Sequence, residues 1–268
     1  MDTHRLQSVK QKGANMINLS GRVALVTGSS RGIGRACAER LAEAGADIVI
    51  NYISSKNAAE ETARAIVAMG RRCYVIKADV SEKDDIESMA DFIKTKIGQM
   101  DIVVSNAATG GFRPLLSTTE AHFRAAMNTN VLSLVYLVQA MLPLLEKSQG
   151  RGKVIGLSSH GAEIAIPWYG LIGASKAALE SIARHLTLEV GHRVNVNIVK
   201  AGLVDTDSTR RIPNSQEMFE TRPQRSMVGD RFLTARDVAD AVVFLASPMS
   251  DLVQGQILTV DGGEGIHP

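Results

Sequence analysis

Cysteine is scarce in this chain: Cys37 and Cys73 are the only two among its 268 residues. Two cysteines are too few for a disulfide framework or a cysteine-based zinc site. The glycines, 23 in number, follow no fixed period, which excludes a collagen-like rod. We therefore expect a globular protein of the reducing cytoplasm, without a bound metal.

An excess of charge of one sign is also missing. The formal net charge is +2, and its signs are scattered along the chain, so no basic footprint for nucleic acid is visible. No segment approaches the ~18 uninterrupted apolar residues of a membrane helix, and the polar start lacks the apolar core of a signal peptide. We interpret residues 1–15 as a flexible N-terminal extension and residues 16–268 as one folded domain, with neither nucleic acid nor a membrane as a partner.

Apolar residues make up 45% of the chain, and short β-branched runs alternate with amphipathic segments of helical length. The expected strands are 22–27, 47–52, 73–77, 101–105, 153–157, 194–199 and 256–260, and the expected helices are 33–44, 57–69, 84–97, 120–146, 172–190 and 235–246. This alternation predicts repeated βαβ units, hence a single α/β domain with a doubly wound parallel sheet of the Rossmann-like kind. Residues 205–232 break the rhythm, and we expect them to form a substrate lid.

A glycine cluster, Gly28-Ser29-Ser30-Arg31-Gly32-Ile33-Gly34, joins the first expected strand to the first expected helix. Glycines at such a turn let the backbone approach a pyrophosphate, and the helix N-terminus adds free N–H groups. The second strand ends in Asn51-Tyr52-Ile53-Ser54-Ser55-Lys56, without the carboxylate that binds the ribose of NAD. Arg31 and Lys56 offer cations for a 2′-phosphate, so the cofactor expected is NADP or NADPH.

Further motifs follow the strands in order: Asp79-Val80 after the third, Asn106-Ala107-Ala108 after the fourth, and Ser158-Ser159 at the end of the fifth. Asn130 lies within the long helix, Ala201-Gly202-Leu203-Val204-Asp205-Thr206 follows the sixth strand, and Val260-Asp261-Gly262-Gly263 ends the last. In this order the motifs resemble the short-chain dehydrogenase/reductase family over about Asn18 to Gly263. The resemblance implies a cofactor-binding set, which is Gly28, Ser30, Arg31, Gly32, Ile33, Gly34, Asn51, Tyr52, Ser54, Lys56, Asp79, Val80, Asn106, Ala107, Lys176, Gly202 and Thr206.

The chain departs from the family at its centre. The usual tyrosine stands four residues before the lysine, but here Ile172 precedes Lys176 by four and Tyr169 precedes it by seven. Seven residues are two helical turns, so Tyr169 and Lys176 can still share a face. This Tyr-x6-Lys spacing resembles the enoyl-thioester reductases of the superfamily. Together with residues 106–114 and Asp205-Thr206-Asp207, it resembles the NADPH-using enoyl-acyl-carrier-protein reductase III group.

The spacing has a chemical rationale. An enoyl reductase delivers hydride to the β-carbon, and charge collects on a thioester oxygen farther from the hydride than in a ketoreductase. Tyr169 would stabilise that enolate, and Lys176 would hold the nicotinamide ribose and aid proton delivery. The candidate catalytic residues are therefore Tyr169, Lys176, Ser159 and Asn130.

The resemblance implies reduction of the double bond of a 2-enoyl thioester on acyl carrier protein or coenzyme A, in fatty acid biosynthesis or a specialised route. It also implies a homotetramer. One alternative is an NADPH-dependent 3-ketoacyl reductase, or another carbonyl reductase or alcohol dehydrogenase of the same family. A third reading is a cofactor-binding sensor without catalysis, which the retained Tyr169, Lys176 and Asn130 argue against.

Overall fold

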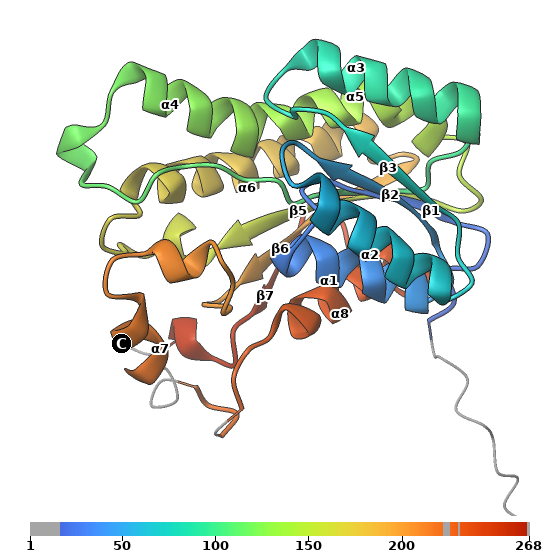
Figure 1. Ribbon diagram of the computed structural model, residues 1–268. Coiled ribbons are helices and arrows are strands. Elements are labelled where there is room, and N and C mark those ends of the chain that lie inside the picture. The colour runs from blue at the N-terminus through green and yellow to red at the C-terminus, as the bar shows by residue number, and fades with distance from the viewer. Residues whose placement is uncertain (1–16, 222–225, 230, 267–268) are drawn as a thin grey trace, which may run out of the picture.

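Seven parallel strands form the sheet at the centre of the molecule (Figure 1), in a computed structural model that describes residues 17–221, 226–229 and 231–266. The strand order is β3-β2-β1-β4-β5-β6-β7. The strands are β1 (Val23–Val26), β2 (Asp47–Tyr52), β3 (Cys73–Lys77), β4 (Ile102–Ser105), β5 (Gly152–Ser159), β6 (Val194–Ala201) and β7 (Ile257–Val260). This is the doubly wound order expected of a dinucleotide-binding sheet, and it confirms the predicted fold class.

Helices cover both faces of the sheet (Figure 1). One face carries α1 (Gly32–Glu43), α2 (Lys56–Ala68) and α8 (Ala235–Ala246), and the other carries α3 (Lys83–Phe92), α4 (Glu120–Met127), α5 (Ser133–Leu145) and α6 (Gly170–Val190). In β1, Ala24 and Val26 join the core beside α1 and α8, whereas Val23 and Leu25 join the core beside α5 and α6. Because both faces are buried, each strand must be apolar at successive residues.

The long helix expected over 120–146 is present but interrupted. The five-residue π-helical turn Asn128–Leu132 separates α4 from α5, and a similar turn, Ile93–Ile97, continues α3. Among the described residues, Glu120–Leu145 is long and apolar enough to cross a membrane by length and composition alone. Leu134, Leu137 and Met141 are fully buried in the core, as in the core helix of a globular domain.

The described part of the segment expected to be a lid, residues 205–232, includes helical structure. It contains a 3-10 turn, Thr209–Arg211, and the short helix α7 (Ser215–Thr221), which the sequence reading missed. Residues 222–225 and 230, and the extension predicted over 1–15, lie outside the described residues. The first part of this segment, up to α7, borders the large cleft described next.

Candidate active site

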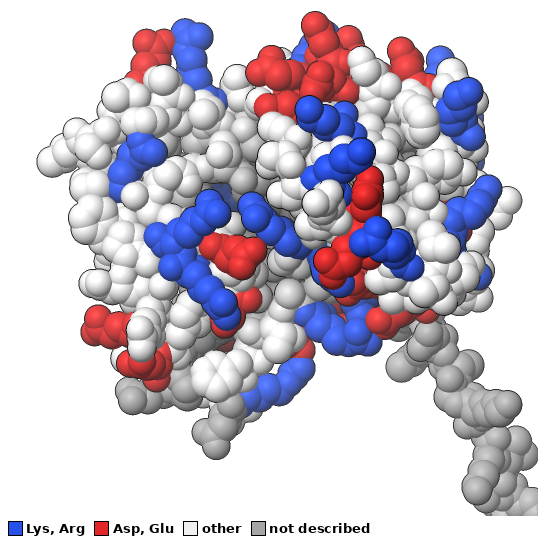
Figure 2. Space-filling model, viewed as in Figure 1, with Lys and Arg blue, Asp and Glu red and all other residues white. Residues whose placement is uncertain are grey.

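A cleft of about 1240 Å³ lies at the carboxyl ends of the strands. Its walls come from the loops after β1 to β6, from the turn at the start of α6 and from α7. The carboxyl edge beside a switch in strand order is where open α/β sheets bind their ligands. On the face shown in Figure 2, acidic side chains gather over α3, whereas basic side chains with some acidic ones among them lie across the middle.

The glycine loop after β1 has the shape that a pyrophosphate requires. Gly28 and Gly32 adopt left-handed φ angles of +61° and +57°, which favour glycine. A Cβ on Gly34 would lie 2.5 Å from the carbonyl oxygen of Gly28, so no larger residue fits between loop and helix. Asn106 donates from Nδ2 to the carbonyl oxygen of Thr27 at 2.9 Å and locks the loop against β4. The loop therefore fits the phosphates of a dinucleotide.

The end of β2 and the first residues after β3 also line the cleft, beyond the glycine loop. The Asn51 side chain is buried; its Oδ1 accepts the Gly28 N–H at 3.2 Å, and its Nδ2 donates to the carbonyl oxygen of Ala78 at 3.0 Å. Six of the predicted cofactor residues line the cleft from these two segments and from the segment after β4. They are Asn51, Tyr52, Ser54, Asp79, Val80 and Ala107. The Asn51 side chain thus links the glycine loop to the residues that follow β3.

Of the two cations predicted for a 2′-phosphate, Arg31 lines the cleft and Lys56 does not. Lys56 begins α2 and its Nζ lies 3.7 Å from Glu60 one turn later, which is the usual pairing of an exposed helix face. Arg31, at the N-cap of α1, is half exposed, and its guanidinium lies 3.9 Å from the Asp207 carboxylate across the cleft. Arg31 is therefore the cation that fits a 2′-phosphate.

Tyr169 and Ser159 meet on the opposite wall of the cleft. Tyr169 is the N-cap residue of α6, and its carbonyl oxygen accepts the Gly173 N–H at 2.7 Å, so the helical hydrogen bonds begin with it. Burial raises the pKa of the Tyr169 phenol, and a hydrogen bond with Ser159 partly opposes that rise. The Ser159 hydroxyl also accepts the Gly161 N–H at 3.2 Å. The structure thus pairs the two predicted hydroxyl groups.

Close packing holds the Tyr169 ring in place. A Cβ on Gly161 would lie 2.5 Å from the ring carbon Cε1, and a Cβ on Gly173 would strike the backbone carbonyl of Gly161. Phe112 stacks on the Tyr169 ring, with ring centroids 6.0 Å apart and planes inclined by 27°. The sequence reading did not single out Gly161, Gly173 or Phe112, although glycines eight residues before and four residues after the tyrosine would have been a signal.

Ile172 stands at the position that normally carries the tyrosine, four residues before Lys176. Ile172 is buried, and a Cβ on Gly110 would lie 3.0 Å from the Ile172 Cδ1. Ile172 therefore closes the site of the ordinary hydroxyl, and Tyr169 is the phenol that reaches the cleft from this helix.

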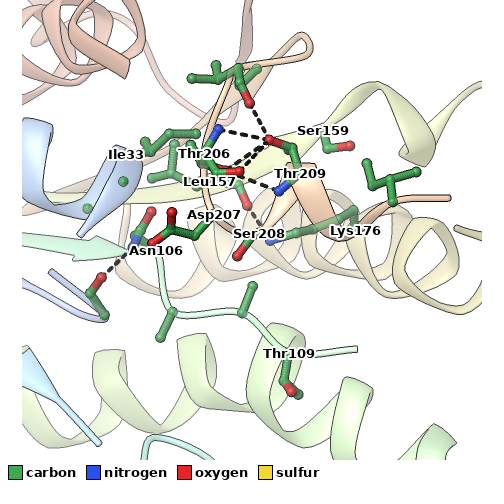
Figure 3. Close-up of a pocket in the computed structure, with 18 of the residues that line it drawn as sticks. Ile33, Asn106, Thr109, Leu157, Ser159, Lys176, Thr206, Asp207, Ser208 and Thr209 are labelled. Carbon is green, nitrogen blue, oxygen red and sulfur yellow. Dashed lines mark hydrogen bonds between the residues drawn. The ribbon is translucent and has the colours of Figure 1, made fainter. Parts of the chain in front are cut away.

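Lys176 is the seventh residue of α6 and borders the same cleft (Figure 3). Its Nζ donates to the carbonyl oxygen of Leu157 at 2.7 Å, and the side chain is nearly fully buried. Burial lowers the pKa of Lys176 to about 8, although the nearby Glu180 carboxylate favours the charged form. The amine is thus a cation at pH 7 that sits close to its titration point.

Asn130 does not line the cleft but braces it. Its Nδ2 donates to the Thr109 carbonyl oxygen at 2.9 Å and to the Ser175 hydroxyl at 2.8 Å, while its Oδ1 accepts the Thr109 N–H at 2.8 Å. Asn130 therefore ties the loop after β4 to α6, and its contacts assign it a positioning task.

Several apolar side chains line the cleft in a part that we call its outer part. Ile164, Ile166, Trp168, Ile212 and Met218 line it from the segment before α6 and from the segment up to α7. Trp168 has a φ of +66°, a strained conformation for a bulky residue that tends to persist at functional sites. Gly202 and Thr206 border the cleft as predicted, and Thr206 is organised by Thr209, whose hydroxyl accepts the Thr206 N–H at 2.9 Å (Figure 3).

The chain is similar to known proteins over nearly its whole length. Residues 28–264 match the family described as Enoyl-(Acyl carrier protein) reductase. The chain is 32% identical to the 1-cyclohexenylcarbonyl-CoA reductase of Streptomyces collinus, over 91% of this chain and 87% of the relative. It is 33% identical to the 7alpha-hydroxysteroid dehydrogenase of Escherichia coli, over 92% of this chain and 95% of the relative.

Solved structures agree with this placement. A short chain dehydrogenase from Burkholderia cenocepacia in complex with NADP superposes with a TM-score of 0.83 and 34% identity, covering 92% of this chain and 99% of that one. The chain belongs to the short-chain dehydrogenase/reductase family and is an oxidoreductase. The NADP in that relative agrees with the cofactor predicted for this chain.

Proposed function

We propose that this protein reduces the carbon–carbon double bond of a 2-enoyl thioester with NADPH. One observation supports the proposal above the others: the Tyr169 phenol lies in the cleft beside Ser159, while buried Ile172 fills the position four residues before Lys176. The hydroxyl is thereby displaced from the ketoreductase position, as the more distant enolate oxygen of an enoyl thioester would require.

The cofactor half of the cleft would be formed by the glycine loop, the end of β2 and the residues after β3. When bound, NADPH supplies a hydride to the β-carbon of the substrate. The glycine loop and the N-terminus of α1 would bind its diphosphate, and Arg31 would bind its 2′-phosphate. Because β2 ends without a carboxylate, nothing there favours the free 2′-hydroxyl of NADH.

The chain's own groups would then handle the charge on the substrate. Tyr169 donates a hydrogen bond to the thioester oxygen as negative charge develops there, and Ser159 orients the phenol. Because the pKa of Tyr169 is raised, the phenol keeps its proton throughout the neutral range. Lys176 would hold the nicotinamide ribose and contribute a positive charge that favours the enolate. The α-carbon of the enolate would then take up one proton from solvent, whose delivery Lys176 would aid, and this proton completes the saturated thioester.

The acyl chain would occupy the apolar outer part beside Trp168, Ile166 and Met218. This lining suits an apolar acyl group carried on acyl carrier protein or coenzyme A, in fatty acid biosynthesis or a specialised route. The protein would act in the cytoplasm as a homotetramer, the assembly implied by its family resemblance.

A carbonyl reductase is the second candidate. Its support is the similarity to a hydroxysteroid dehydrogenase and the Ser159–Tyr169 pair, since a phenol paired with a serine can also polarise a ketone. The two functions differ in where the hydride goes, and so in the substrate consumed.

One assay separates the candidates. NADPH oxidation is followed with a crotonyl thioester and, in parallel, with an acetoacetyl thioester, each on coenzyme A and on acyl carrier protein. We expect faster turnover of the crotonyl thioester. Faster turnover of the acetoacetyl thioester would replace the enoyl reductase with the ketoreductase, and NADPH binding without turnover of either would favour the sensor.

A further inference from the structure

Two buried charged residues, Lys200 and Glu180, lie close to Lys176 and are not among the residues that line the cleft. Lys200 on β6 is 1% exposed, and its Nζ lies 3.3 Å from the Glu180 carboxylate on α6. Glu163, on the exposed segment after the 3-10 turn His160–Ala162, contacts the same Nζ. Glu180 is also buried and accepts a hydrogen bond from the Ser158 hydroxyl at 2.5 Å. The proposed reaction uses none of these groups directly.

The fold brings these residues together through the register of two strands. Ser158 on β5 is the partner of Lys200 on β6, so both side chains project from the same face of the sheet, towards α6. Glu180 stands one helical turn after Lys176 on that helix, on the same side. The carbonyl of Leu157 holds Lys176 while the hydroxyl of the next residue holds Glu180.

A buried charge needs a partner, because water no longer stabilises it. Glu180 has two nearby cations, since Lys200 lies at 3.3 Å and Lys176 also feels its charge. Removing the charge of either lysine therefore changes how strongly Glu180 interacts with the other lysine. Glu163 also neutralises Lys200, but its side chain is 65% exposed and solvent screens its effect.

We infer that Glu180 and Lys200 are positioning residues that act as a pair to set the charge of Lys176 in the cleft. This inference depends on the role proposed above for Lys176 at the nicotinamide ribose, but not on which substrate is reduced. In it, Glu180 keeps the Lys176 amine cationic at neutral pH, and Lys200 limits how strongly Glu180 does so.

The signs follow from the charges. Burial alone pulls the pKa of Lys176 down, to about 8 in the intact protein, and Glu180 opposes the fall. Glu180→Gln removes the stabilising anion, so the Lys176 amine would lose its proton at lower pH. Lys200→Met removes a competing cation, so the amine would keep its proton to higher pH.

The other titratable groups near α6 come from each element packed against it. They are His160, which pairs with Asp261 at 2.9 Å, Glu163 beside it, Tyr136 on α5, Lys153 on β5, and Glu120, His122 and Arg124 on α4. Within α6 itself they are Arg184, His185 and Glu189, with Tyr169 at its N-cap. Glu180 is the charged group that acts on the pKa of Lys176.

The test measures the dissociation constant of NADPH against pH, from 6 to about 10, by fluorescence titration. In the wild type we expect binding to weaken above about pH 8, as Lys176 loses its proton. We call the pH above which NADPH binding weakens the break. A neighbouring charge typically shifts a pKa by ~1–3 units, so the break for Glu180→Gln should move to lower pH by roughly one unit. Up to about tenfold weaker NADPH binding would follow at pH 9. The break for Lys200→Met should instead move to higher pH, by about half a unit.

The chain provides a matched control in Lys153. It is also a buried lysine, 2% exposed, on β5, and its Nζ lies 2.6 Å from the Asp251 carboxylate. It stands five residues before Ser158, about 16 Å along the strand at ~3.3 Å per residue. Lys153→Met should lower the melting temperature as Lys200→Met does, yet leave the pH at which NADPH binding breaks unchanged.

Opposite shifts for Glu180→Gln and Lys200→Met, with no shift for Lys153→Met, support the inference. Unmoved breaks in both, or shifts of one sign in all three variants, would overturn it and leave a structural role. Should Glu180→Gln not fold, an unmoved break in Lys200→Met is sufficient to overturn it. Because NADPH binding needs no acyl substrate, the outcome is independent of whether the crotonyl thioester is reduced.

Discussion

Replacing Tyr169 with phenylalanine removes one oxygen atom and leaves the ring that the fold holds. Phe112 still stacks on that ring, and Gly161 still faces its edge. The Ser159 hydroxyl loses its phenol partner but keeps the Gly161 N–H at 3.2 Å. Little else in the structure depends on the phenol, so the change tests the hydroxyl itself.

The size of the effect can be worked out from that geometry. If Tyr169 is the donor to the developing enolate, its loss removes one oxyanion contact, which typically costs ~10²–10³ in turnover, or about 3–4 kcal/mol. The glycine loop, Arg31 and Lys176 are untouched, so NADPH affinity should stay nearly unchanged. The loss should therefore fall on kcat.

The assay compares kcat for the crotonyl thioester and the dissociation constant of NADPH between wild type and Tyr169→Phe. Tyr74→Phe is the matched control, because Tyr74 packs edge-on against Phe92, is not among the residues that line the cleft, and should lose no turnover. Wild-type turnover by Tyr169→Phe would refute the assignment of the phenol. An equal loss in both variants would mean that the effect is not specific to the enolate contact.

Three further results are expected. Arg31→Ala should weaken NADPH binding by tenfold or more, because it removes a charge-assisted phosphate contact of about 1.5–3 kcal/mol, and should leave NADH binding unchanged. Titration with both cofactors checks this, and the control variant Lys56→Ala should change neither affinity. Gly161→Ala should displace the Tyr169 ring, since the new Cβ would lie 2.5 Å from Cε1, so turnover should fall while NADPH titration stays near wild type. Light scattering should give a tetramer at micromolar concentration, and Leu188→Glu should break it, because that α6 side chain is 83% exposed; a wild-type monomer would contradict the assembly.

The sequence predicted the sheet closely because its strands are buried on both faces. The limits of β2, β3 and α8 coincide with the predicted ranges, and the other strands differ by a few residues at their ends. Continuous apolar runs between amphipathic segments leave a parallel sheet few alternatives. The site residues Arg31, Ser159 and Tyr169 could be placed because each follows directly from the end of a strand or the start of a helix.

The misses at Asn130 and Lys200 depend on contacts distant in sequence, whereas the miss at Lys56 depends on where α2 begins. The π-helical turn at Asn130 is accompanied by hydrogen bonds to Thr109 and Ser175, and no local pattern shows them. Lys56 was assigned to the cofactor because strand ends usually face the cleft, but α2 begins there and turns the side chain towards Glu60. The sequence analysis did not single out Lys200, and only the fold shows it buried beside Glu180.

The glycines that confine Tyr169 also define a pattern that can be searched for in unaligned chains. Gly161, Tyr169, Gly173 and Lys176 form Gly-x7-Tyr-x3-Gly-x2-Lys. The two glycines are the positions where a side chain would collide with the phenol ring or with the backbone beneath it. A chain with a tyrosine seven residues before the lysine but with larger residues at these positions has no room for the ring there. The pattern thus separates chains built around a displaced phenol from those in which a tyrosine falls at that spacing by chance.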